Sequence, residues 1–143
     1  VKADEVKRVI FCSGKIYYEL LEKQKNDEIK EVAIVRVEQL YPLPMKQMEA
    51  VYHGYKNAVD VIWVQEEPEN MGAWPYILRK MRRTIFNDIE VVSRKESSST
   101  ASGFAKQHAD QQAYILAKAF EMAVTEKEEK IAKKSVSKIY NVD

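Results

Sequence analysis

The amino-acid sequence predicts an α/β fold of three layers, in which a mostly parallel sheet of four to five strands carries helices on both faces. The first observation is the continuous apolar run Val-Ile-Trp-Val at residues 61–64, which is typical of a strand buried on both faces. The second is the helical spacing of Trp74, Ile77 and Met81 soon after that run. Strands and helices that alternate in this way form parallel pairs through right-handed crossovers.

The first half of the chain supplies two further predicted strands and two helices. Ser13 precedes a segment with an apolar helical face and is a candidate N-cap. Pro44 suits the first turn of a helix, because the missing N–H would have no partner there. The predicted segments are a strand at 6–12, a helix at 15–25, a strand at 32–37 and a helix from Pro44 to about Gly54.

The second half is expected to repeat the alternation. The strand at 59–65 should give way to an acidic loop, because Pro68 cannot donate a ladder hydrogen bond. Gly72 is free to adopt a positive φ in the turn that follows. The remaining predicted segments are a helix that starts near Trp74, a strand at 89–93 and a last helix that contains Tyr114, Ile115, Ala119, Phe120 and Met122.

Composition favours one domain at residues 1–124 and excludes several classes of partner. The 143 residues include 23 basic and 22 acidic side chains, so no basic surplus favours nucleic acid or an anionic membrane surface. No apolar run is long enough for a transmembrane helix, and the polar start lacks the apolar region of a signal peptide. Cys12 is the single cysteine, so neither an intrachain disulfide nor a cysteine-based zinc site is expected. We expect a cytoplasmic location and a chain cut from a longer protein.

The composition changes after Thr125. Residues 125–143 are rich in lysine and acid, and Glu126–Lys130 and Glu129–Lys133 are favourable i,i+4 pairs. We predict a charged tail that continues the last helix.

Three groups of residues could carry chemistry, and each has a simpler structural interpretation. Ser13-Gly14-Lys15 lies between a strand and a helix, where backbone N–H groups and a lysine could hold an anion, although a helix cap and a solvated lysine are the favoured interpretation. Cys12 could be an activated nucleophile or a small core residue. Glu66 and Glu67 could split their pKa values for acid catalysis, although neighbouring carboxylates more often point apart into solvent.

Three segments together resemble one enzyme family. They are Phe11-Cys12-Ser13-Gly14-Lys15 with Tyr17-Tyr18 behind it, the run Ala-Ile-Val-Arg-Val-Glu-Gln-Leu-Tyr-Pro at residues 33–42, and Gln65-Glu66-Glu67-Pro68 followed by Asn70, Gly72, Ala73 and Trp74. In order and spacing they resemble the carboxyl-terminal region of the 2-oxoglutarate dehydrogenase E1 component over about residues 6–124. The resemblance implies a fold like the transketolase carboxyl-terminal domain, with residues 125–143 outside the family pattern.

The resemblance also implies a role within a larger enzyme. The whole E1 homodimer uses thiamine diphosphate and magnesium to decarboxylate 2-oxoglutarate and passes the succinyl group to the lipoyl group of an E2 succinyltransferase. The motifs that hold this cofactor are absent here, so we expect no catalytic residue, metal site or cofactor in this chain alone. It would instead support dimerisation and shape the approach to the active site, with Glu66, Glu67, Asn70 and Trp74 as candidates for contacts with the remaining E1 domains.

Some family members carry an acetyl-CoA activator site in this region. The candidate residues carried over by the resemblance share the ability to hold phosphate and are Ser13, Gly14, Lys15, Arg36, Gln65, Arg94 and Lys95. Two alternatives remain open, namely a stand-alone ligand- or partner-binding module and a domain of a related E1 that acts on 2-oxoadipate.

Overall fold

Strands and helices alternate along the part of the chain that the computed structural model describes, residues 1–99 and 103–121. None of the helices in these residues is long and apolar enough to cross a bilayer. The predicted tail at 125–143 and Met122 lie outside the described residues. The elements in order are β1 (Arg8–Cys12), α1 (Ile16–Asn26), β2 (Val32–Arg36), α2 (Met45–His53), β3 (Asp60–Pro68), α3 (Trp74–Met81), β4 (Glu90–Arg94) and α4 (Ala105–Phe120).

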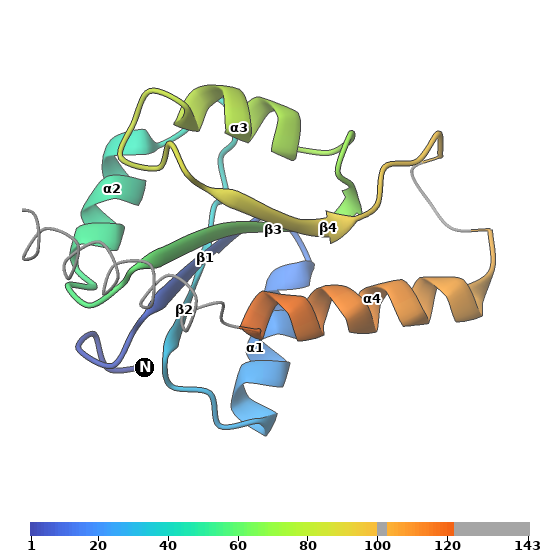
Figure 1. Cartoon of the computed structure of the whole chain (residues 1–143), viewed down its shortest axis with the longest axis horizontal. Coiled ribbons are helices and arrows are strands. Elements are labelled where there is room, and N and C mark those ends of the chain that lie inside the picture. The colour runs from blue at the N-terminus through green and yellow to red at the C-terminus, as the bar shows by residue number, and fades with distance from the viewer. Residues whose placement is uncertain (100–102, 122–143) are drawn as a thin grey trace, which may run out of the picture.

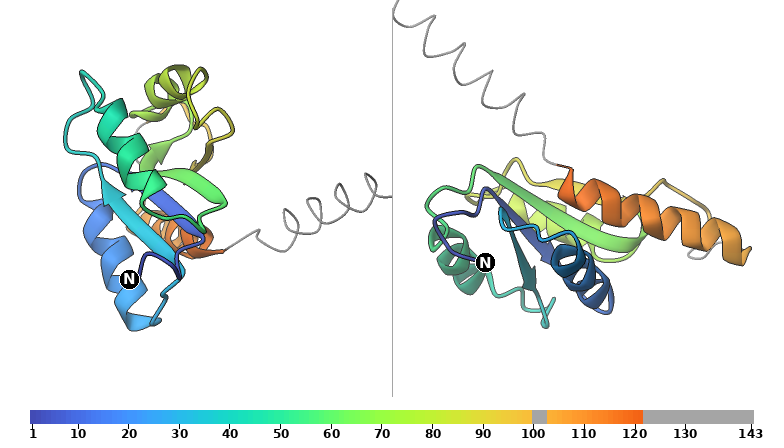
Figure 2. Two further views of the ribbon diagram at one scale, coloured as in Figure 1. Left: turned by 90° about the vertical axis from the view of Figure 1, so that its left-hand side faces the viewer. Right: turned by 90° about the horizontal axis from the view of Figure 1, so that it is seen from below.

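The described strands form one sheet in the order β2-β1-β3-β4, and every neighbouring pair is parallel. Helices α2 and α3 cover one face and α1 and α4 cover the other, so the molecule has three layers (Figures 1 and 2). This arrangement confirms the predicted α/β class. All five residues of β1 are buried, as expected for a central parallel strand.

The sheet separates two hydrophobic cores. Under α2 and α3, Phe11 and Trp63 pack with Phe86, which meets Phe11 edge-on with ring centroids 5.5 Å apart. Under α1 and α4, the alternate strand residues Ile10 and Ile62 pack with helix residues. Because side chains of a strand alternate between its faces, the same two strands serve both cores.

The structure corrects two local predictions. The segment 65–68, which we expected to be an acidic loop, continues β3, and its last residue Pro68 pairs with Arg94 of β4. Between Val64 and Pro68 the register shifts against β4, which is a β-bulge that tolerates the proline. Ser13 is not the helix cap, since α1 has Lys15 at its N-cap and no side-chain cap hydrogen bond.

One buried ion pair ties the amino ends of the central strands to the last helix. Arg8 of β1 donates from Nε to Asp60 Oδ2 of β3 at 2.6 Å, and both side chains are less than a tenth exposed. Arg8 Nη1 also donates to the carbonyl oxygens of Ala119 at 2.9 Å and Glu121 at 3.0 Å. The guanidinium therefore satisfies a carboxylate and the free carbonyls at the end of α4 together.

We predict that Asp60→Ala lowers the free energy of unfolding by about 3–5 kcal/mol, because it leaves the Arg8 charge buried without its carboxylate. Urea denaturation measures this loss. The control is Glu31→Ala, which removes the half-exposed Lys7–Glu31 pair and should cost less than about 1 kcal/mol. Equal losses in the two variants would contradict the assigned role of the buried pair.

Candidate functional site at the carboxyl edge of the sheet

The chain reverses its direction of winding between β1 and β3. The segment after β1 leads to α1 on one face, whereas the segment after β3 leads to α3 on the opposite face. Adjacent parallel strands whose connections part in this way leave a crevice at their carboxyl ends, which is the usual ligand position in open α/β sheets. The switch point between β1 and β3 is therefore the expected position of a site.

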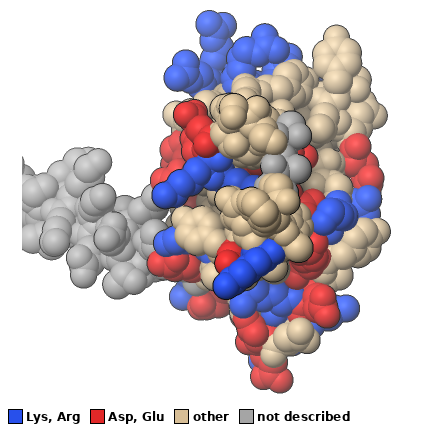
Figure 3. Space-filling view, turned by 90° about the vertical axis from the view of Figure 1, so that its right-hand side faces the viewer, with Lys and Arg blue, Asp and Glu red and all other residues tan. Residues whose placement is uncertain are grey.

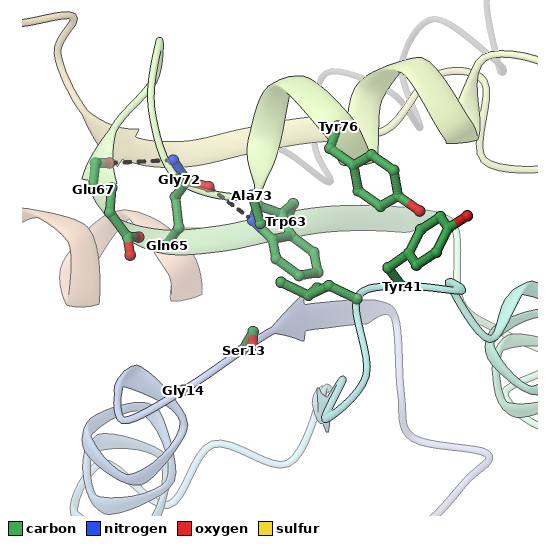
Figure 4. A pocket seen from close by; sticks show the side chains of 10 residues that line it. Ser13, Gly14, Tyr41, Trp63, Gln65, Glu67, Gly72, Ala73 and Tyr76 are labelled. Atoms are coloured by element: carbon green, nitrogen blue, oxygen red, sulfur yellow. Dashed lines mark hydrogen bonds between the residues drawn. The ribbon is translucent and has the colours of Figure 1, made fainter.

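A cavity of about 540 Å³ lies there, in the position that the topology predicts. Figure 4 shows the rings of Tyr41 and Tyr76 on one side of Trp63, and all three residues line the cavity. Tyr41 is 82% exposed and belongs to the loop after β2, so three connections contribute to the wall. The lining residues are Ser13, Gly14, Leu40, Tyr41, Trp63, Gln65, Glu67, Gly72, Ala73 and Tyr76.

Gln65 holds the floor of this cavity together. Its Oε1 accepts hydrogen bonds from Trp63 Nε1 at 3.1 Å and from the Trp74 backbone N–H at 2.9 Å. Its Nε2 donates to the carbonyl oxygens of Pro68 at 3.1 Å and Met71 at 2.8 Å. The side chain thus joins β3, the turn that follows and the first residue of α3. Both polar atoms of the amide have hydrogen-bond partners within the chain.

Glu66 and Glu67 point to opposite faces of the sheet because they belong to the extended strand. Glu66 Oε1 lies 2.7 Å from Lys15 Nζ on the α1 side. Glu67 faces the cavity and packs against Gly72, where an added Cβ would come within 3.0 Å of the Glu67 side chain. Gly72 has a φ of +65°, as predicted, so close approach and backbone conformation both require glycine.

Lys15 is held by two carboxylates. In addition to Glu66, its Nζ lies 3.4 Å from Glu19 Oε1, and hydrogen bonding to Glu66 raises the pKa of Lys15. Gln112 of α4 donates to Glu19 Oε2 at 2.8 Å and to Glu66 Oε1 at 3.0 Å. These contacts join α1, β3 and α4 on the face opposite the cavity, and Lys15 is not among the residues that line the cavity.

Arg36 lies at the end of β2 and is bound by its own neighbours. Its Nε is 2.9 Å from Glu38 Oε1, its Nη1 donates to Tyr18 Oη at 2.9 Å, and its guanidinium lies over the rings of Tyr17 and Tyr18. Parallel pairing places it beside Cys12 of β1. The structure brings Ser13, Gly14 and Gln65 into the cavity wall but leaves Arg36 outside it.

Arg94 and Lys95 line a separate, smaller cavity of about 210 Å³ beside the edge strand β4. Arg94 is only 8% exposed, and its Nη2 lies 2.9 Å from His108 Nδ1. Its Nε has no hydrogen-bond partner among the described residues, and none of their carboxylates pairs with it. A buried guanidinium without an anion is energetically costly, so this site favours an anionic ligand.

The predicted contact residues differ in their accessibility. Trp74 is 6% exposed and packs in the core under α3, which corrects the expectation that it presents its ring to a partner. Asn70 exchanges hydrogen bonds with the backbone of Ser97, at 3.0 and 3.1 Å, and ties the turn after β3 to the segment after β4. Asn70 and Glu67 are exposed, and their role in a domain contact stays a prediction.

Cys12 is a core residue rather than a nucleophile. Its thiol is fully buried, and burial raises the pKa of Cys12 to about 12. A thiol that remains protonated in this way is a poor nucleophile. No group of three or more His, Cys, Asp or Glu residues that could hold a metal ion occurs within residues 1–99 and 103–121.

Sequence reasoning missed the aromatic wall of the cavity. Tyr41 and Tyr76 lie 35 positions apart in the sequence. Tyr41 belongs to the loop after β2 and Tyr76 to the helix after β3, so only the fold brings the two rings together. The available signal was an aromatic residue directly before Pro42, in a turn that hydrophobic periodicity leaves polar. Gln112 and His108 were missed for the same reason, because each contacts its partner, Glu66 or Arg94, from the distant helix α4.

The fold and the cavity define a three-layer α/β domain with a switch-point crevice whose lining includes three aromatic residues and is uncharged except for Glu67. The sequence profile described as 2-oxoglutarate dehydrogenase C-terminal matches residues 1–120. The chain therefore belongs to the family of 2-oxoglutarate dehydrogenase carboxyl-terminal domains.

Curated relatives agree with this assignment. An oxoglutarate dehydrogenase from Buchnera aphidicola is 41% identical over 114 residues, which are 78% of this chain and 12% of that protein. The 2-oxoglutarate dehydrogenase E1 component of Cupriavidus necator is 41% identical over 124 residues, 84% of this chain and 13% of that protein. That of Azotobacter vinelandii is 40% identical over 121 residues, 81% of this chain and 13% of that protein. The chain thus spans a small part of the relatives it matches.

We predict that Gln65→Leu lowers the free energy of unfolding by about 2–4 kcal/mol, because the Trp63 indole N–H and the Trp74 backbone N–H lose a buried acceptor. Urea denaturation followed by tryptophan fluorescence measures the change. Gln47→Leu, at an exposed position of α2, is the matched control and should change stability by less than about 0.5 kcal/mol. An unchanged midpoint in Gln65→Leu would contradict the assigned role of the amide.

Proposed function

We propose that this chain is the non-catalytic carboxyl-terminal domain of an oxoglutarate dehydrogenase E1 component. The observation that carries the proposal is the family match over residues 1–120, together with relatives that share about two-fifths of the aligned residues. The three relatives named above all carry 2-oxoglutarate or oxoglutarate in their names, which favours this substrate over 2-oxoadipate for the parent enzyme.

In the parent, the expected reaction is decarboxylation of 2-oxoglutarate followed by transfer of the succinyl group to the lipoyl group of E2. Thiamine diphosphate supplies the carbanion chemistry when it is bound, but the residues described here do not fit its magnesium diphosphate. Magnesium is held by several oxygen ligands, whereas the switch-point cavity offers one carboxylate, Glu67. We propose that other domains of the parent hold the cofactor.

The cavity suits a supporting role. Its wall places two tyrosine rings and a backbone turn at the carboxyl edge of the sheet, where open α/β sheets present their binding surfaces. We propose that Glu67, Asn70 and the exposed Tyr41 contribute to contacts with the preceding domains or with the second subunit of a homodimer, and that these contacts shape the approach to the active site.

An acetyl-CoA-like effector is a further part of the proposal. Arg94 is its strongest anchor, since its guanidinium is buried and its Nε has no hydrogen-bond partner among the described residues, and Lys95 adds an exposed cation beside it. A phosphate there would supply the missing anion. Ser13, Gly14, Lys15, Arg36 and Gln65 lie along the same carboxyl edge; an anion at Lys15 has to compete with Glu66 and Glu19.

We predict that the 143-residue chain alone neither binds thiamine diphosphate nor oxidises 2-oxoglutarate. Titration calorimetry with the cofactor and magnesium should give no heat of binding at micromolar concentrations, and a standard assay with E2 and E3 should give no turnover. A full-length E1 protein is the positive control. Micromolar binding to the isolated chain would show that the domain carries cofactor ligands of its own.

We predict that Arg94→Ala and Lys15→Ala in the full-length parent each weaken activation by acetyl-CoA by about 1.5–3 kcal/mol, the range for hydrogen bonds to charged groups. Turnover measured against acetyl-CoA concentration gives the half-activating concentration for each variant. Lys23→Ala, which removes a partly exposed cation that pairs with Asp27 at the far end of α1, is the control and should leave that concentration unchanged. Unchanged activation in both test variants would place the effector elsewhere.

A further inference from the structure

Helix α3 ends in a dense cluster of positive charge. Four of the five residues 79–83 are cationic, in a chain whose formal net charge is only +1. All four side chains are exposed, and Figure 3 shows Lys and Arg atoms standing out at the top of the molecule, the side on which α3 lies. We call them the α3 basic cluster, which consists of Arg79, Lys80, Arg82 and Arg83.

No carboxylate of the described residues forms an ion pair with this cluster. Arg79 and Lys80 contact only the ring of Tyr76, at 5.8 and 5.7 Å from its centroid. Other exposed cations of the described residues, such as Lys46 and Lys56, also lack an ion pair, but they stand singly, whereas the cluster gathers four cations within five residues. The charge of the cluster is therefore left for an external partner.

The fold does not require so much charge at this position. α3 packs through Trp74, Ile77 and Met81, and none of the four cations takes part. One or two cations would satisfy the negative end of the helix dipole.

The backbone beneath the cluster is fixed. Thr84 Oγ1 donates to the Met81 carbonyl at 2.8 Å and accepts from the Phe86 backbone N–H at 3.1 Å. Phe86 is fully buried in the core, so the turn that carries Arg82 and Arg83 is anchored at both ends. Cations on a rigid turn lose little backbone entropy on binding and act as a preorganised surface.

We propose that the α3 basic cluster is a docking surface for an acidic segment of a different polypeptide. Arginine forks bind carboxylates through paired hydrogen bonds, and the exposed side chain of Ile85 beside them offers an apolar contact. The cluster extends over about one helical turn, which matches three or four carboxylates. Exposed Asp88 and Glu90 follow it along the chain and disfavour a long polyanion such as nucleic acid or a membrane surface.

The test uses the whole 143-residue chain and a fluorescent peptide with about four consecutive glutamates, followed by anisotropy near physiological salt. Arg82→Gln/Arg83→Gln should weaken binding at least about five-fold, and Arg82→Lys/Arg83→Lys should retain part of it because the charge remains. Lys46→Gln/Lys56→Gln removes two exposed cations from the α2 region and should change the dissociation constant less than about two-fold. Thermal melting of each variant checks that the fold is intact.

Backbone NMR shifts locate the contact. On addition of the peptide, the amides of residues 79–86 should move first, while those around Arg94 and Ser13 should not. The proposal is overturned by the absence of binding, by an equal loss in the Lys46/Lys56 control, or by tighter binding of the same cluster to an octanucleotide or to phosphatidylserine vesicles than to the peptide.

Discussion

The parallel pairing of β1 with β3 is the constraint on which the other parts of the structure depend. Both strands are buried on both faces, so each face must be covered by helices, and a three-layer domain is the result. Because all the strands run in one direction, their connections leave from one edge. The helices that follow β1 and β3 depart to opposite sides, and the cavity is the space that this divergence leaves.

A β-bulge in β3 and the side-chain amide of Gln65 determine the local structure of the site at this edge of the sheet. After Val64 the register of β3 against β4 shifts, and β3 continues to Pro68. In this last part of the strand Gln65 and Glu67 face the cavity, whereas Glu66 faces α1 and α4. The Gln65 amide then satisfies donors and acceptors of the strand, the turn and the helix. The conformation of the turn is thereby defined by internal hydrogen bonds, which leaves the tyrosine rim and Glu67 for external contacts.

The basic residues at the carboxyl edge differ in what already binds them. Lys15 and Arg36 are neutralised by nearby carboxylates, whereas Arg94 is buried without one among the described residues. The α3 basic cluster is also without carboxylates, but it is exposed and faces solvent from another side of the domain. Charge balance within the chain, rather than the presence of a lysine or arginine, separates structural cations from those available to a ligand.

Hydrophobic periodicity was sufficient to predict the α/β class and the order of the elements. The run at 61–64 and the stripe of Trp74, Ile77 and Met81 encode buried faces locally, and the parallel arrangement follows from their alternation. The positive φ of Gly72 could also be predicted, because the residues that favour a turn are neighbours in the sequence. Family resemblance added the role within a larger enzyme.

Only the tertiary structure decided what surrounds each side chain. Pro68 suggested the end of a strand, yet pairing with Arg94 across a bulge keeps it in the sheet. Trp74 suggested an exposed anchor, yet the core under α3 encloses it. Tyr41 and Tyr76 form one wall, and Arg94 is buried against His108, through contacts between segments far apart in the chain. Periodicity records which face of an element is apolar; burial and charge partners depend on long-range packing, which no local pattern contains.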